Sequence, residues 1–68
     1  MHVGARIRAR RHELRLSQAA LAADIGCTFQ QVQKYERGRN RVSASALWRA
    51  AEALEVEVGY FFEGLKGG

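Results

Sequence analysis

The sequence predicts a small all-helical domain, and three observations support this fold class. Apolar residues recur at the three- or four-residue spacing of a helix, and no segment alternates as a β-strand does. Proline, which breaks helices, is absent. Serine, threonine and glycine occur where helices of ordinary length would begin and end. We therefore expect a single domain over residues 1–68, with an ordered core over about 4–63 and a C-terminal tail that frays.

The first helix is expected over about residues 4–14. One side of it carries Val3, Ile7, Arg11 and Leu14, which is the pattern of a helix that packs against a core. Arg11 therefore lies on the side that should be buried. Because a buried charge needs a partner of opposite sign, the sequence predicts an acidic partner for Arg11.

The next two helices are expected to be separated by a short turn. Ser17 can cap a helix over 18–25, and Gly26 follows as the residue where that helix ends in a left-handed conformation. Thr28 opens a capping-box pattern (T-x-x-Q), so a new helix begins near it and runs through Glu36. A helix, a short turn with glycine and a second helix make the helix-turn-helix pattern.

The rest of the chain is expected to hold a loop and two further helices. The loop covers residues 37–41, which include Gly38 and show no periodicity. Ser43 can cap the fourth helix, which is anchored by Leu47, Ala51 and Leu54 with Trp48 beside them. A last short helix over about 57–62 presents Val58, Tyr60, Phe61 and Phe62.

The distribution of charge is more informative than the net charge of +4. Residues 1–51 contain ten Arg or Lys and three acidic residues, whereas residues 52–68 contain one Lys and four acidic residues. Nine of the eleven cationic residues are arginine, which suits contacts with phosphates and base edges. The basic part of the chain, residues 1–51, is attracted to polyanions, and the acidic part, residues 52–68, is repelled by them. This charge pattern favours a nucleic-acid partner over the alternative of a basic surface that contacts only solvent.

The composition also excludes several classes of protein. No apolar run could span a bilayer and no signal peptide is present, so we expect a soluble, cytoplasmic protein without membrane contact. A single cysteine cannot form an internal disulfide, and Cys27 is expected to be a small core residue. Together with His2 and His12 it offers too few ligands for zinc. The chain has no catalytic residue set and no phosphate-cradling glycine loop, so we expect neither an enzyme nor a cofactor.

The outward side of the third helix is expected to carry Gln30, Gln33 and Lys34. Glutamine can bind adenine through N6 and N7, and lysine can donate to guanine O6 and N7. Phe29 lies on the flank of this ridge, where it either touches a thymine methyl group or covers the edge of the core. Because the ridge lacks an acid and is framed by arginines, it favours DNA over solvent as its partner.

Groups that can bind phosphate lie on both sides of this ridge. The N-terminus of the second helix offers backbone N–H groups beside Gln18. The loop after the third helix carries Arg37, Arg39, Asn40 and Arg41, where the chain would pass along a DNA backbone. The alternative for this loop is a solvated turn without a ligand.

Several motifs, in a fixed order, carry a resemblance to a known family. They are I-R-x-R-R at 7–11, L-S-Q-x-x-L-A at 16–22, glycine at 26, Y-E-R-G at 35–38, serine at 43, L-x-x-x-A-x-A-L at 47–54 and V-x-V-x-Y-F-F at 56–62. Over residues 4–62 the chain resembles the phage-repressor (Cro/cI-like, XRE) helix-turn-helix family. The resemblance implies a compact five-helix domain that places its recognition helix in the major groove. It also implies a transcriptional repressor or activator that commonly acts as a dimer.

The resemblance also assigns roles to individual residues. By position, it implies base contacts from Thr28, Phe29, Gln30, Gln33 and Lys34. It implies phosphate contacts from Gln18, Arg37, Arg39, Asn40 and Arg41, and an ion pair between Arg11 and Glu36.

Three residues depart from the family pattern. Val42 stands where proline is frequent, and Phe29 is bulkier than the usual small polar residue. Ala50 replaces a larger aliphatic side chain, and Trp48 is expected to fill the space.

Two hypotheses for function follow from these observations. The first is a sequence-specific regulator of transcription, more specifically a repressor, that binds double-stranded DNA as a homodimer through Val58, Tyr60, Phe61 and Phe62. The second is a protein-interaction module, such as the antitoxin of a toxin–antitoxin pair, which regulates its own gene. This alternative rests on the aromatic end at residues 60–62 together with Leu65.

Overall fold

The computed structural model describes residues 2–64, which form four α-helices followed by one 3₁₀ helix. The elements are α1 (His2–Glu13), α2 (Gln18–Ile25), α3 (Phe29–Glu36), α4 (Ala44–Leu54) and the 3₁₀ helix η1 (Val58–Phe62). Residues 2–64 contain no strand, so the predicted all-α class and its five helical segments are confirmed. The predicted frayed tail begins at Gly64, and its residues 65–68 lie outside the described part of the chain.

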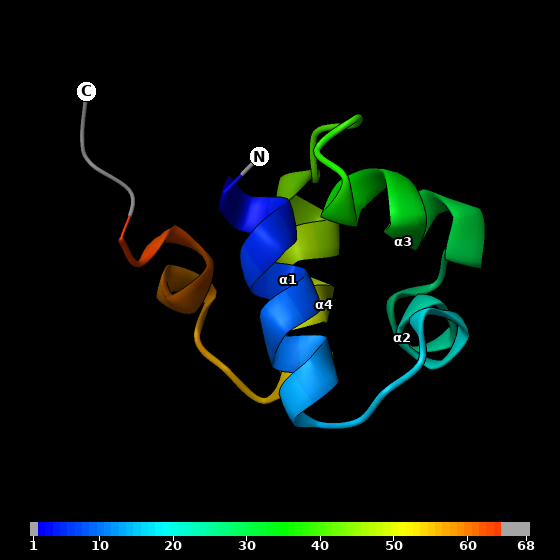
Figure 1. Ribbon diagram of the computed structural model, residues 1–68, viewed down its shortest axis with the longest axis horizontal. Helices are drawn as coiled ribbons and strands as arrows, with labels where there is room; N and C mark the ends of the chain where they lie inside the picture. The colour runs from blue at the N-terminus through cyan, green and yellow to red at the C-terminus, as the bar shows by residue number, and fades with distance from the viewer. Residues whose placement is uncertain (1, 65–68) are drawn as a thin grey trace.

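The helices surround one core, with α1 at the centre of the arrangement (Figure 1). α1 crosses in front of α4, with α2 and α3 on one side of it and η1 on the other. α2 packs against α3 and α4, and α1 packs against α3, α4 and η1. Every helix buries at least one large apolar side chain in the core: Ile7, Leu21, Ile25, Val32, Leu47, Leu54 and Phe61. Burial of each such side chain stabilises the fold by about 1.5–3 kcal/mol.

The helices begin at the capping residues that the sequence predicts. The side-chain oxygens of Ser17, Thr28 and Ser43 accept hydrogen bonds from the backbone N–H groups of Ala20, Gln31 and Ala46, respectively. Each bond satisfies one N–H group that has no partner within its helix. The reciprocal bond of a capping box, from Thr28 N–H to the Gln31 side chain, is not formed among the hydrogen bonds of residues 2–64.

A left-handed residue follows the end of each of the four α-helices within two positions. Gly26 (φ 76°) and Gly38 (φ 72°) take this conformation without strain after α2 and α3. Arg15 (φ 58°) and Glu55 (φ 59°) take it after α1 and α4 although each carries a side chain. These two ends have no glycine signal in the sequence. The first helix was expected to continue to residue 14 because Leu14 lies on its apolar side, but α1 ends at Glu13.

Two arginines of α1 fix the C-terminal part of the fold. Arg6 Nε donates to the carbonyl oxygen of Tyr60 (3.1 Å), and its guanidinium group lies 3.9 Å from the centre of the Tyr60 ring. Arg10 Nε donates to the carbonyl oxygen of Leu54 (2.9 Å). These two cations therefore hold η1 and the end of α4 against α1.

The prediction that Trp48 fills space in the core is wrong. Trp48 is 61% exposed, whereas Ala50 is buried. The buried side of α4 consists of Leu47, Ala50, Ala51 and Leu54. Since position 48 is turned by about 100° from position 47, its side chain points away from that side.

Candidate nucleic-acid interface

α3 presents a polar ridge to solvent and a narrow apolar side to the core. Gln30 and Lys34 are exposed and Gln33 is half-buried, whereas Val32 is completely buried. Because these positions lie on opposite sides of one helix, Val32 fixes the direction in which the ridge points. Thr28, which caps α3, is exposed at the start of the ridge.

Phe29 is 43% exposed at the first turn of α3. Its ring is therefore neither buried in the core nor fully in solvent. This exposure leaves part of the ring available to a ligand beside the ridge.

A buried ion pair connects α3 to α1. Arg11 Nε donates to Glu36 Oε2 (2.7 Å), and Arg11 Nη2 donates to Glu36 Oε1 (3.0 Å). The two side chains are only 10% and 3% exposed. Arg11 Nη1 also donates to the carbonyl oxygen of Leu16 (2.9 Å), which follows α1 in the chain. The ion pair itself ties the end of α1 to α3. The acidic partner that the sequence predicts for Arg11 is thus present.

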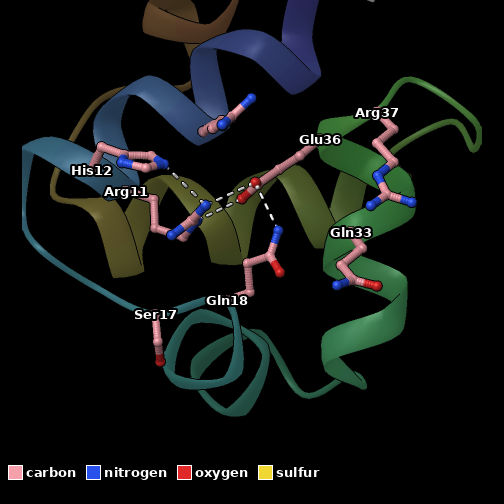
Figure 2. A pocket seen from close by; sticks show the side chains of 8 residues that line it. Arg11, His12, Ser17, Gln18, Gln33, Glu36 and Arg37 are labelled. Atoms are coloured by element: carbon pink, nitrogen blue, oxygen red, sulfur yellow. Dashed lines mark hydrogen bonds and ion pairs between the residues drawn. The ribbon is translucent and has the colours of Figure 1, made fainter.

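Glu36 also orients the first residue of α2. Gln18 Nε2 donates to Glu36 Oε1 (3.1 Å), and Figure 2 shows Glu36 between Arg11 and Gln18. The backbone N–H groups of Gln18 and Ala19 precede the first bonds within α2 and have no bond to an acceptor within residues 2–64. This end of α2 is therefore free to bind an anion.

The loop after α3 carries three arginines. Arg39 N–H donates to the carbonyl oxygen of Lys34 (2.9 Å) across Gly38, so the end of α3 is held in a defined turn. Arg37, Arg39 and Arg41 are exposed and form no ion pair within residues 2–64. Asn40 is half-buried in the same loop.

A polar cavity of about 510 Å³ lies between α1, α2 and the end of α3 (Figure 2). It is lined by Arg8, Arg11, His12, Ser17, Gln18, Gln33, Glu36 and Arg37. Arg8, His12 and Ser17 were not among the site residues expected from the sequence. For Arg8, the signal was its three-residue spacing from Arg11, which puts both residues on neighbouring positions of one helix surface.

The aromatic residues predicted for a dimer contact have different surroundings. Phe61 is completely buried, so its expected place on an interface surface is wrong: its ring closes the core. The ring of Tyr60 is half-buried beneath the guanidinium group of Arg6. Val58 is half-buried and Phe62 is 43% exposed. Leu65 lies outside the described residues.

Two further properties apply to the part of the chain that the structure describes. None of its helices is long and apolar enough to cross a membrane. No three His, Cys, Asp or Glu side chains within residues 2–64 lie together as ligands for a metal ion.

The two helices α2 and α3, the turn at Gly26 and the outward ridge of α3 define a helix-turn-helix domain. The sequence profile of the helix-turn-helix family matches residues 7–61, and the chain belongs to this family, in its phage-repressor-like (Cro/cI, XRE) branch. The fold and family are those of DNA-binding regulators.

Curated relatives have high sequence identity with this chain. A transcriptional regulator in the ATPase CF(0) region of Rhodospirillum rubrum is 58% identical over 67 residues, which are 98% of this chain and 62% of that protein. A helix-turn-helix regulator of Sinorhizobium fredii is 59% identical over 63 residues, which are 93% of this chain and 44% of that protein. The chain thus spans about half the length of these relatives.

Solved structures have the same fold. The P22 c2 repressor in complex with a synthetic operator superposes with a TM-score of 0.86 at 31% identity, covering 94% of this chain and 97% of that one. The restriction-modification controller protein C.AhdI of Aeromonas hydrophila superposes with a TM-score of 0.86 at 34% identity, covering 90% of this chain and 92% of that one.

Proposed function

We propose that the protein is a sequence-specific regulator of transcription, and specifically a repressor, that binds double-stranded DNA in the cytoplasm. The observation that carries this proposal is the acid-free ridge of α3, which is followed by a loop with three exposed arginines that form no ion pair within residues 2–64. The regulator relatives and the repressor solved with its operator support the same function.

The exposed ridge supports direct reading of bases in the major groove. Gln30 can bind an adenine through two hydrogen bonds, and Lys34 can donate to a guanine. Gln33, Thr28 and Phe29 flank these two side chains and complete the proposed base-contacting set. The proposed phosphate contacts are Gln18, Arg37, Arg39, Asn40 and Arg41, which lie at the start of α2 and after α3.

The test begins with selection of bound duplexes from a random pool at physiological salt. Gln30→Ala and Lys34→Ala should each reduce the preference for the selected site over random DNA by about 1–3 kcal/mol. Gln31→Ala is the matched control, because this half-buried residue lies on the same helix outside the ridge. If the two ridge variants keep the full preference for the selected site, direct reading by this ridge is wrong.

A homodimer is part of this proposal, because one helix-turn-helix reads only a few base pairs. Phe61 lies in the core, and Arg6 covers Tyr60. Of the predicted contact residues, only Val58 and Phe62 are therefore left for a dimer contact. The exposed Trp48 adjoins Val58 around an apolar hollow of about 320 Å³. This hollow lies on α4 and η1, so a second copy can bind there without covering α3.

An antitoxin-type role would use the same apolar surface for a different partner. The observation that favours it is the exposure of Trp48 and Phe62. A pulldown with the products of neighbouring genes separates the two roles. A stoichiometric partner protein that is lost in Trp48→Ser would favour the interaction module, and its absence would favour the plain regulator.

A further inference from the structure

We propose that the hollow on α4 and η1 binds a small organic cation with an apolar body, of the class of the aromatic and alkyl quaternary ammonium ions. The hollow measures about 320 Å³ and is lined by Trp48, Ala51, Glu52, Val56, Glu57 and Val58. None of these residues is a proposed DNA contact, so this binding goes beyond the DNA-binding function. Only its effect on dimerisation, treated last, rests on the homodimer proposed above.

The charge of the hollow favours a cation. Glu52 and Glu57 are exposed and form no ion pair within residues 2–64, and no cationic residue of this stretch lines the hollow. By contrast, the glutamates that do form ion pairs each contact an arginine of α1. The hollow therefore carries two carboxylates without a counter-charge from the described residues, and a positively charged ligand can supply it.

The indole ring of Trp48 favours an organic cation in particular. A cation is attracted to the face of an aromatic ring, and most strongly to that of tryptophan. Trp48 is exposed, and the cation–π contact formed within residues 2–64 is that of Arg6 with Tyr60. Trp48 and Glu52 are four residues apart on α4, so they are neighbours on one side of the helix. A cation over the indole ring therefore lies close to a carboxylate.

The rest of the lining favours a ligand with an apolar body over a metal ion. Ala51 is buried, and Val56 and Val58 are half-buried. A metal ion would leave these apolar side chains in contact with water, whereas a ring or an alkyl chain covers them. Within residues 2–64, no three His, Cys, Asp or Glu side chains lie together as metal ligands. A hollow of about 320 Å³ has room for a substituted benzene ring.

The first arm of the test uses the fluorescence of Trp48, which is the only tryptophan of the chain. The protein, without DNA and at low micromolar concentration, is titrated with benzyltrimethylammonium chloride at constant ionic strength. We expect a saturable change in fluorescence. Benzyl alcohol and benzoate carry the same ring without the positive charge, and both should bind roughly tenfold more weakly or worse. If benzyl alcohol binds as tightly as the cation, the proposal is wrong.

Variants of the two carboxylates test the role of charge. Glu52→Gln and Glu57→Gln should each weaken the binding of benzyltrimethylammonium about threefold, as an exposed charge pair does, and leave the binding of benzyl alcohol unchanged. Asp24→Asn is the matched control, because Asp24 is an exposed acid on α2 outside the hollow. If both glutamine variants behave like Asp24→Asn, the proposal is wrong.

A variant of Trp48 tests the role of the ring. Trp48→Leu keeps an apolar side chain but removes the aromatic face, and NMR of the Val56 and Val58 methyl groups then replaces fluorescence. We expect benzyltrimethylammonium to bind about threefold more weakly to this variant than to the wild type. Equal affinities would overturn the assignment of the indole ring to the site.

The second arm separates this site from the homodimer. A cation in the hollow covers the surface that a second copy would bury, so benzyltrimethylammonium should raise the dimer dissociation constant in sedimentation equilibrium, and benzyl alcohol should not. A dimer that is unchanged at saturating cation overturns the competition. A wild-type protein that is monomeric without the cation overturns the homodimer instead. The binding site stands or falls with the first arm, which needs neither a dimer nor DNA.

Discussion

Glu36 joins the core of this domain to its candidate interface. Its carboxylate accepts three hydrogen bonds, two from Arg11 and one from Gln18. The side chain is only 3% exposed, so solvent cannot replace a bond that is lost. One buried acid thus offsets the charge of Arg11 on α1 and orients Gln18 at the start of α2.

We expect Glu36→Gln to destabilise the fold by about 3 kcal/mol, because it leaves the buried Arg11 without a counter-charge. For a domain of this size, this corresponds to a fall in melting temperature of roughly 12–24 °C, which circular dichroism can measure. Arg11→Met combined with Glu36→Leu should recover most of the loss, since no charge is then buried alone. A loss below about 1 kcal/mol for Glu36→Gln would show that the pair contributes little.

Cys27 gives a second prediction for a single residue. It packs half-buried against the core, and burial raises the pKa of its thiol above the ordinary value because the thiolate is poorly solvated there. The stability linked to this shift is complete below the pKa of the unfolded chain and is lost as pH rises through the higher folded pKa.

We therefore expect iodoacetamide to alkylate Cys27 more slowly in the native protein than in urea at the same pH. Cys27→Ala should reduce the decline of stability above about pH 8.5 in urea titrations. Equal alkylation rates in the folded and unfolded chains would contradict this assignment.

The sequence predicts where the helices start better than it predicts contacts between residues that are far apart in the chain. Ser17, Thr28 and Ser43 act within three residues, so their hydrogen bonds follow from local spacing. The contact of Arg6 with Tyr60 joins residues 54 positions apart, and local spacing carries no signal for it. The exposure of Trp48 was predictable from the helical period, but the small size of Ala50 suggested a neighbour that fills space.

Gly4 sets how closely α1 approaches α3. A Cβ atom at position 4 would collide with the backbone carbonyl oxygen of Tyr35, and backbone cannot move aside as a flexible side chain can. We expect Gly4→Ala to destabilise the fold by about 1–3 kcal/mol, as overpacking does. Gly59→Ala is the matched control, because a Cβ at position 59 has no neighbour within 4 Å. Similar urea midpoints for the two variants would contradict this close approach.

For the molecule as a whole, the arginines divide into two groups with different tasks. Arg6 and Arg10 of α1 hold η1 and the end of α4, and Arg11 is paired with Glu36. Fewer cationic side chains are therefore free than the composition suggests. Many of the free ones lie around α3 and the cavity beside it. The sequence predicts that the molecule has a basic body and an acidic end. Only the tertiary contacts show which cationic side chains remain available to a ligand.

The hollow beside α4 and η1 is the candidate surface for a second copy of the domain. The hollow is lined by Trp48, Val56 and Val58 together with Glu52 and Glu57, so this surface combines apolar and acidic side chains. A ligand of high negative charge is repelled there, and a second copy of the same surface can bury the exposed indole ring against apolar side chains only where its own Glu52 and Glu57 stay in solvent. A dimer that reads two half-sites needs both α3 ridges free and about one DNA turn apart.

We expect the protein to dimerise at tens of micromolar, and more readily on a palindromic duplex. Trp48→Ser should raise the dimer dissociation constant tenfold or more, because a central aromatic anchor dominates an interface of this kind. Phe29→Ser removes another exposed aromatic ring, but on α3, and should leave the dimer constant unchanged. Sedimentation equilibrium measures both variants against the wild type. A wild-type monomer at these concentrations, both free and on the palindrome, would exclude the dimer, and equal constants for the two variants would exclude Trp48 as its anchor.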